Sequence, residues 1–242
     1  MKTAKHLFQF FVVSFLLLAT LSYLAHISEA TPAGATITGN TTASAGSTVP
    51  GNRNDSGGTI TTLVMNTVQQ DSAWKGYVGN VSGLLTLDDA LGNTIYNWQL
   101  ASVTGKVFAS RSSSITWNLI NCSVQADVDT EQTALAFAST DSDSINRTFA
   151  STNHKSFLVA TRNMTSCRFT PTFVADAAQT ANAASLFQEI LLDDGTSFVY
   201  STIIEASSPN GFDNETRHFQ LIVPQSKATS VPTPYYFYIE LG

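Results

Sequence analysis

Short runs in which apolar and polar residues alternate fill the chain from residue 60 onward. In the first run, Ile60 and Val64 fall on one side of an extended chain, and Leu63 and Met65 fall on the other. Turn-forming residues separate the later runs, at 88–89, 92–93, 104–105, 193–195 and 209–211. We therefore predict an all-β fold, and we expect a β-sandwich of immunoglobulin-like or jelly-roll type. The later expected strands are residues 84–87, 94–98, 106–108, 114–117, 156–159, 197–204, 218–223 and 235–241.

Helix is expected to be a minor component. Residues 130–138 begin with Thr130 as a capping residue and Glu131 in the first turn, and residues 175–186 are rich in alanine. We expect one or two short helices at these places, covering one end of the sandwich. No internal repeat is visible, so residues 59–242 are predicted to form a single β-sandwich domain.

The first thirty residues have the pattern of an export signal. Lys2 and Lys5 precede an apolar run over residues 7–25, and Ser28-Glu29-Ala30 supplies small residues at the two positions that a signal peptidase reads. We expect residues 1–30 to be a signal peptide that is cleaved after Ala30. The alternative is an uncleaved anchor, because an apolar run of this length, at about 1.5 Å per residue, can just span a hydrocarbon core of ~30 Å. Both interpretations place the remainder outside the cytoplasm, and only the second makes the membrane a partner.

Residues 31–58 have a different composition from the rest of the chain. They are built mainly of Thr, Ser, Gly, Ala, Asn and Pro, and Ile37 and Val49 are their only sizeable aliphatic residues. Such a segment buries too little surface to offset its conformational entropy, so we predict a flexible stalk rich in Ser, Thr and Gly. The alternative is that residues 35–38 form a short strand against a partner sheet.

Charged residues are scarce. The chain has 12 Lys and Arg against 18 Asp and Glu, a formal net charge of −6, and charged residues make up 12% of it. This is about half the usual share, and the basic residues are scattered. A surface that follows a phosphate backbone has no electrostatic basis here, so nucleic acid is excluded as a partner.

Cys122 and Cys167 are the only two cysteines. In an oxidising compartment they are expected to form a disulfide, and the loop of about 45 residues that it closes is worth about 4 kcal/mol in the chain-entropy model. No C-x-x-C motif or histidine cluster accompanies them, which argues against a metal or redox role. No cofactor is predicted.

The acceptor pattern Asn-x-Ser/Thr recurs along the chain and predicts N-glycosylation at exposed positions. The alternative is that a composition rich in Ser and Thr produced these matches without selection. Asn121 is the doubtful member, because its neighbour Cys122 is expected to be bridged. The pattern occurs at Asn40, Asn54, Asn80, Asn121, Asn146, Asn163 and Asn214.

Catalytic chemistry has few candidates. Beyond the leader the chain holds two histidines, His154 in a polar turn and His218, which alternates with Gln220 and is expected to face solvent. A hydrolase would need one of them within hydrogen-bonding reach of a carboxylate in a cleft. Ser82 lies in a G-N-V-S-G sequence that misses the G-x-S-x-G elbow by one position. We predict that the protein is not an enzyme.

Calcium is the strongest ligand candidate, because hard oxygen ligands cluster in two places. The first cluster departs from an EF-hand, with Gln132 where glycine belongs and Ala138 where the bidentate glutamate belongs. Solvated loop carboxylates are the default interpretation. The candidate ligands are Asp127, Asp129 and Glu131 in the first cluster, and Asp141, Asp143 and Asn146 in the second.

A more specific signal is the W-K-G-Y-V-G-N-V-S-G segment at residues 74–83. Together with the expected hairpin over residues 84–98 and the F-Q-L-I-V-P and Y-F-Y-I-E-L runs near the end, it resembles archaeal extracellular or cell-surface β-proteins of unassigned activity. The resemblance covers most of residues 57–242. It implies export, a β-rich domain and glycosylation, and it brings no catalytic residues. A more distant likeness is to surface filament subunits whose β-domain accepts the N-terminal strand of a neighbour.

The aromatic residues of this region have two interpretations. Trp74, Tyr77 and Trp98 are expected to cover a sheet, with Gly76, Gly79 and Gly83 allowing close backbone approach. The alternative is an exposed platform on which a carbohydrate stacks.

These features together predict a secreted, N-glycosylated structural or adhesive protein of the cell surface. The expected mechanism is β-strand addition, in which an extended segment completes the open edge of a sheet on another copy or on another envelope protein. Residues 58–68 are the candidate arm. The first alternative is an extracellular carbohydrate-binding module, and the second is an envelope-associated hydrolase.

Overall fold

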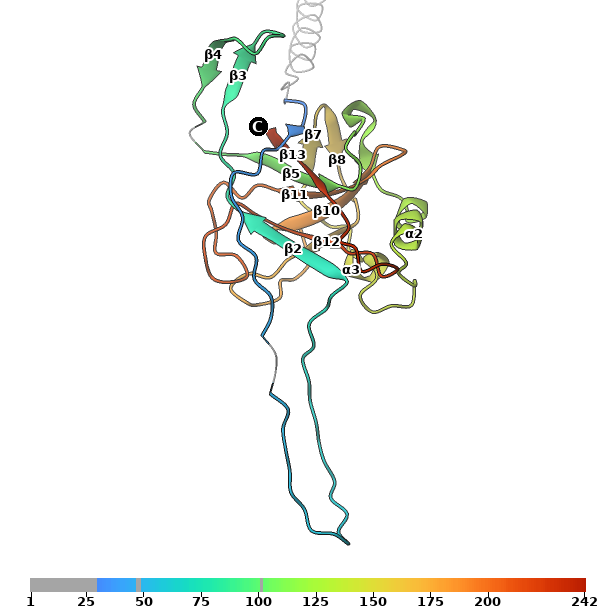
Figure 1. Ribbon diagram of the computed structural model, residues 1–242. Coiled ribbons are helices and arrows are strands. Elements are labelled where there is room, and N and C mark those ends of the chain that lie inside the picture. The colour runs from blue at the N-terminus through green and yellow to red at the C-terminus, as the bar shows by residue number, and fades with distance from the viewer. Residues whose placement is uncertain (1–29, 47–48, 101) are drawn as a thin grey trace, which may run out of the picture.

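The computed structural model describes residues 30–46, 49–100 and 102–242 of the chain (Figure 1). The expected signal peptide therefore lies outside the described residues, apart from Ala30. Within these ranges, two helices and a 3-10 turn accompany the strands: α2 (Gln125–Ala134), α3 (Ile145–Thr148) and η1 (Trp117–Leu119). The strands are β1 (Ala33–Gly34), β2 (Trp74–Gly79), β3 (Leu85–Asp88), β4 (Thr94–Trp98), β5 (Gly105–Ser110), β6 (Asn121–Cys122), β7 (Phe157–Val159), β8 (Arg162–Met164), β9 (Phe169–Pro171), β10 (Gln188–Asp193), β11 (Phe198–Ile203), β12 (Phe219–Pro224) and β13 (Tyr236–Leu241).

The largest sheet is antiparallel and runs in the order β1-β13-β5-β11-β10-β6, with β9 also paired to β10. Its register places apolar side chains in rows across the strands. One row on the first face joins Phe237, Ala109, Tyr200 and Leu191, because each is the register partner of the next. The matching row on the opposite face joins Tyr238, Phe108, Ser201, Ile190 and Phe169. Both faces of this sheet are therefore covered.

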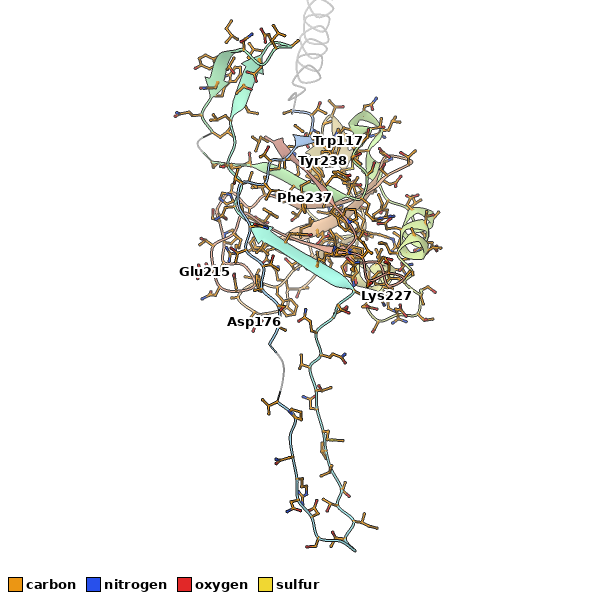
Figure 2. All side chains as sticks on the ribbon, in the orientation of Figure 1. Trp117, Asp176, Glu215, Lys227, Phe237 and Tyr238 are labelled. Atoms are coloured by element: carbon orange, nitrogen blue, oxygen red, sulfur yellow. A yellow bond between two sulfur atoms is a disulfide. The ribbon has the colours of Figure 1, made fainter. Side chains whose placement is uncertain are left out.

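Different elements cover the two faces. On the first face, the two-stranded sheet β12-β2 and helix α2 contribute Leu221, Val223 and Val128 to one hydrophobic cluster. On the second face, the hairpin β7-β8 and the disulfide region form another cluster around Phe108 and Ile190. Figure 2 shows Tyr238 beside Trp117 on this second face, where their ring centroids are 5.3 Å apart. The all-β prediction is confirmed, whereas a sandwich of two sheets is not.

Several strands match their predicted positions and others do not. The alternating pattern located β3, β4, β5, β7, β11, β12 and β13. It missed β10, whose residues Glu189 to Leu192 are buried on both sides, so no polar residue alternates with them in the usual way. Residues 114–117 were predicted as a strand and instead lead into η1, and residues 60–65 were predicted as a strand and form none.

Helix prediction was partly right. The helix predicted over residues 130–138 exists as α2, but it begins at Gln125, because the Asp127 carboxylate accepts from the Val124 N–H at 2.7 Å and caps it. It ends at Ala134, two residues before Ala136, which has a φ of 59°. Two short helices are present among the described residues, and neither is long and apolar enough to cross a membrane.

The alanine-rich segment over residues 175–186 is not helical, which corrects the prediction made for it. Ala175 and Asp176 both have positive φ, of 48° and 60°, and their N–H groups donate to the backbone carbonyls of Gly211 and Phe212. The Gln179 side chain then bridges the segment by bonding to Thr172 and Leu186. Side-chain hydrogen bonds of this kind compete with helix formation.

The Cys122–Cys167 disulfide is confirmed, and it links positions 45 residues apart. Cys167 is buried in the second hydrophobic cluster, next to Phe169 and Met164. Cys122 belongs to β6, which pairs with the end of β10. The bridge therefore fastens the β7-β8 cover to the edge of the main sheet.

We expect the Cys122→Ser/Cys167→Ser double variant to lose about 3 to 4 kcal/mol of unfolding free energy, because the open chain regains loop entropy. Urea denaturation of the oxidised protein and of the variant measures the difference. The native protein unfolded in the presence of dithiothreitol is the control and should match the variant. A difference of less than about 1 kcal/mol would contradict a bracing role for the bridge.

Candidate functional site

The outer edge of β2 is open. Among the residues that the structure describes, β2 pairs only with β12, and Ile222 lies opposite Gly76. The Ile222 N–H donates to the Glu189 carboxylate at 2.7 Å, so it points away from β2. In an antiparallel pair, residues opposite each other point both toward the partner or both away from it. Gly76, and Val78 two residues later, therefore direct their backbone N–H and C=O groups toward the free edge.

This edge lacks the usual protection against pairing. Natural edge strands carry an outward-pointing lysine, a proline, a bulge or a covering segment. The one charged residue of β2 is Lys75, and its ammonium donates to the Thr233 carbonyl at 2.7 Å, so it is held against the body. Gly76 and Val78 are both exposed. An extended chain can reach their backbone groups without displacing a side chain.

The corresponding edge of the main sheet is already covered. Ala33 pairs with Ile239 and Gly34 with Tyr238, and the Ala35 N–H donates to the Phe237 carbonyl at 2.9 Å. This short pairing lies inside the segment predicted as a stalk, and it ends directly before the alternative strand considered at residues 35–38, whose first residue also bonds to β13. It covers the middle of β13 and leaves β2 as the longer open edge on the body of the protein.

A long excursion connects β1 to β2 (Figure 1). Residues 58–68, defined here as the arm, belong to this excursion and form no strand. Ile60 is 101% exposed and Val64 is 98% exposed, so their side chains touch nothing else among the described residues. Figure 2 shows the side chains of the excursion pointing into solvent on both sides of each limb. The arm has no charge and no proline, which is the composition of a segment that pairs readily with a sheet edge.

Glu189 holds the β12-β2 sheet on the main sheet. Its carboxylate is fully buried and accepts from the Ile222 N–H, and its other oxygen, Oε1, has no hydrogen-bond partner among the described residues. Burial raises the pKa of Glu189 well above its ordinary value, and the Ile222 hydrogen bond opposes this only in part. The strand pair β12-β2 is thus attached to the core through a carboxyl group that resists ionisation.

The three aromatic residues of the proposed carbohydrate platform do not come together. Trp74 packs against Phe137 and Phe149, and its Nε1–H donates to the Asp143 carbonyl at 2.8 Å. Tyr77 is partly buried against Phe237. Trp98 lies on the hairpin β3-β4 and is exposed. The first two therefore cover the sheet, as the main interpretation predicted, and only Trp98 is available to a ligand.

Both histidines bond to the backbone. His154 is buried, its Nε2 accepts from the Cys167 N–H at 2.9 Å, and its Nδ1 lies 2.8 Å from the Lys155 carbonyl. Burial lowers the pKa of His154, so the neutral ring braces the disulfide region. His218 is partly buried rather than fully solvent-facing, and its Nδ1 accepts from the Val81 N–H at 3.0 Å. In the described part of the chain, the hydrogen-bond partners of both rings are backbone groups and not carboxylates.

The calcium candidates are held by other partners. The Lys227 ammonium bonds to Asp141 and Asp143, each at 2.8 Å. Asp127 caps α2, Asp129 accepts from Gln125, and Glu131 pairs with Arg111. Asn146 lies in α3, where its N–H donates to Gln132. Within the described part of the chain, no three acidic, histidine or cysteine side chains form a group that could hold a metal ion.

A polar cleft of about 430 Å³ lies between α2 and the turn that joins β10 to β11. Arg111 forms two hydrogen bonds with the buried Glu131, at 3.0 and 2.5 Å, and the Tyr200 hydroxyl donates to the same carboxylate. Asp193 also lines the cleft, and its pKa is raised to about 6, mainly by burial. The lining offers hydroxyls and carboxylates but no imidazole, so it lacks the base that a serine hydrolase uses.

The predicted glycosylation sites differ in exposure. Asn40, Asn54, Asn80, Asn121, Asn163 and Asn214 are exposed, and Asn146 is half-buried. Asn80 follows the end of β2, where its Oδ1 accepts from the His218 N–H. Asn121 is accessible even though its neighbour Cys122 is bridged.

Sequence reasoning identified the arm but did not predict β2 as a strand. The segment was interpreted instead as one whose rings cover a sheet and whose glycines allow close backbone approach. The signal that could have located it is the pair of aromatic residues Trp74 and Tyr77. Comparison with family models, with curated proteins and with solved structures finds no match for this chain.

We expect Glu189→Gln to stabilise the protein at pH 7 by roughly 1 kcal/mol or more, because an amide keeps an acceptor for Ile222 and needs no proton. The folded-state pKa of Glu189 is raised, so its contribution is fully present below the unfolded-state value of 4.5 and is lost as pH rises through the folded-state value. The variant should show less loss of stability above pH 4.5. Thermal unfolding from pH 4 to 8 measures this, with the exposed Glu215→Gln as control. Parallel profiles for native protein and E189Q would contradict the assignment.

Proposed function

We propose that the protein is a secreted structural or adhesive protein of the cell surface that associates with copies of itself by β-strand addition. The observation that carries the proposal is the coexistence in one chain of an unprotected strand edge, β2, and an unpaired strand-forming arm, residues 58–68. The arm of one copy is the donor, and β2 of the next copy is the acceptor.

The lengths of the two partners are compatible. At about 3.3 Å per residue the arm reaches roughly 36 Å, and the six residues of β2 span roughly 20 Å. The added chain would bond to the outward backbone groups of Gly76 and Val78 and extend the β12-β2 sheet to three strands. Its alternating side chains would lie beside Tyr77 and Val78, which are only partly covered. Main-chain bonds give affinity in this mode of recognition, and the side chains give register.

In the structure the arm does not fold back onto the β2 strand of its own chain. Only residues 69–73 separate the arm from β2, and in the structure they lead the arm away from the strand edge (Figure 1). The two limbs of the excursion hold the arm clear of the body. Pairing of this arm with β2 of another copy therefore depends on the concentration of the protein.

Export and glycosylation are part of the same proposal. The disulfide supports an oxidising compartment, because such bridges persist outside the cytoplasm. The exposure of six of the seven acceptor asparagines supports modification by N-linked glycans. A surface rich in hydroxyls and poor in charge suits a protein that presents glycans and packs against its own copies.

Replacing the arm's apolar residues should abolish association. In the variant with serine at Ile60, Leu63, Val64, Met65 and Val68, the arm loses its strand propensity and its side-chain contacts. Because these residues are exposed, the thermal midpoint should change by less than about 2 °C. Light scattering and sedimentation velocity of residues 31–242 measure the mass. Ile37→Ser/Val49→Ser, two exposed changes elsewhere in the excursion, is the matched control. Unchanged mass in the arm variant, or a native protein that is monomeric at all concentrations, would contradict the proposal.

The acceptor edge is tested by Val78→Pro, which removes the outward N–H that the donor would use while leaving the bonds of β2 to β12 in place. Association should fall at least tenfold, whereas Val78→Thr, which keeps the N–H, should associate like the native protein. Sedimentation velocity at matched concentrations gives the comparison. Equal association of V78P and V78T would place the acceptor somewhere other than β2.

A further inference from the structure

The hairpin formed by β3 and β4 stands away from the body of the protein (Figure 1). Its register pairs Leu85 with Trp98 and Leu87 with Tyr96, so four apolar side chains share one face. The intervening pair, Thr86 and Asn97, lies on the opposite face, and Ile95 falls at the register irregularity of β4, where it is 80% exposed. The hairpin therefore has an apolar face, defined by Leu85, Leu87, Tyr96 and Trp98, and an opposite face on which Thr86 pairs with Asn97.

The apolar face has no cover among the described residues. Leu87 is 54% exposed, Tyr96 59% and Trp98 48%, and the ring of Trp98 packs only against that of Tyr96, at 5.1 Å. A two-stranded hairpin alone is marginally stable in water and needs further strands or a packed face. Exposed apolar patches of this kind mark sites of contact with proteins, membranes or ligands.

The base of the hairpin is fixed to the body. A Cβ at Gly83 would lie 2.6 Å from Leu241 Cδ1, so the chain passes directly over the end of β13 just before β3 begins. Residues 80–84 link the end of β2 to β3, and the apolar face therefore follows directly on from the open edge of β2. A copy that is attached at β2 has this hairpin within its reach.

Charge at the tip limits what the occupant can be. Asp88 and Asp89 lie at the turn, where hydrogen bonds from Thr86 and Thr94 to Asp88 and from Asn93 to Asp89 lower the pKa of both carboxyls. Both stay ionised near neutral pH, so insertion of the tip into a lipid bilayer would place two charges in hydrocarbon, which is costly. Residues 84–98 contain no Lys or Arg. The complement of this uncharged apolar face is another uncharged apolar face.

We propose that the apolar face of the hairpin packs against the same face of a second copy, related by a two-fold axis. In a self-complementary contact Leu87 and Tyr96 of the two copies lie near the axis, and an antiparallel arrangement keeps the acidic tips apart. The proposal rests on the proposed function in one respect: strand addition makes rows of copies, and the hairpins join one row to another.

The area of the contact explains why the rows would strengthen it. Half-exposed aromatic residues with one leucine offer roughly 300 to 400 Å² per copy. Two copies would bury roughly 700 Å² in total, which is below the roughly 1,200 Å² of a stable specific interface. One hairpin pair is therefore weak, and many pairs along two rows act together through their high effective concentration.

The test uses cysteines placed on the two faces. Both natural cysteines are bridged, so Leu87→Cys and Asn97→Cys each introduce a single free thiol. Leu87→Cys should form covalent dimers under mild oxidation at least tenfold faster than Asn97→Cys, measured by non-reducing electrophoresis. Equal rates would overturn the proposal. A Leu87→Cys protein that also carries Val78→Pro should retain the preference for this face at a lower rate.

The outcomes separate the two proposals. If the native protein forms no rows and Leu87→Cys still reacts tenfold faster than Asn97→Cys, strand addition fails and hairpin pairing stands. If rows form and the two thiols react alike, hairpin pairing fails and strand addition stands. Flotation with phosphatidylcholine vesicles tests whether the face binds a membrane instead. If the native protein floats with the vesicles, the Leu87→Asp variant does not, and the two thiols cross-link at equal rates, the apolar face binds lipid and hairpin pairing fails.

Discussion

Burial of both faces of the β5-β11-β10 strands is the constraint on which the rest of the structure depends. Tyr200 and Leu191 face one cover while Phe108 and Ile190 face the other, and the six residues of β5 are buried without exception. Each cover must therefore be fastened to the central sheet. The disulfide fastens one, and the Glu189 hydrogen bond to Ile222 fastens the other. The second fastening turns β12 toward the core, and by the alternation of the antiparallel ladder it turns the free backbone groups of β2 outward.

This arrangement explains two features outside the core, the arm and the hairpin of β3 and β4. The arm and the hairpin both expose apolar residues that the central sheet has no room to bury, because its faces are already covered. The arm has the length, the absence of charge and the strand propensity to complete β2, and the hairpin has an apolar face that follows on from the same edge. Strand addition and hairpin pairing use different atoms, backbone groups in one case and side chains in the other. As proposed, the two contacts would join copies in two directions, which suits a structural role at a surface.

Sequence patterns predicted those parts of the fold in which local chemistry and tertiary position agree. The hairpin of β3 and β4 follows from alternation and from its turn residues, and the disulfide follows from the presence of just two cysteines in a chain whose first thirty residues predict export. The strand β10 was not predicted, because it is buried on both sides and the polar Glu189 occupies a fully buried position. The glycine-containing segment that forms β2 was not predicted as a strand. Long-range hydrogen bonds to Gly211 and Phe212 outweighed the helix propensity of the residues after Ala175. The arm was visible in the sequence, but its acceptor depends on which edge β1 covers, and that pairing joins residues about 200 positions apart.

Hydrogen exchange at the amides of Gly76 and Val78 tests the central claim most directly, because it reports on the backbone groups that the donor strand would engage. In dilute protein these amides face solvent and should exchange rapidly. In concentrated, associated protein both should slow by at least a hundredfold, while the neighbouring amides of Lys75 and Tyr77, which point toward β12, stay protected throughout. Association that leaves Gly76 and Val78 exchanging as fast as in the dilute protein would contradict strand addition at β2.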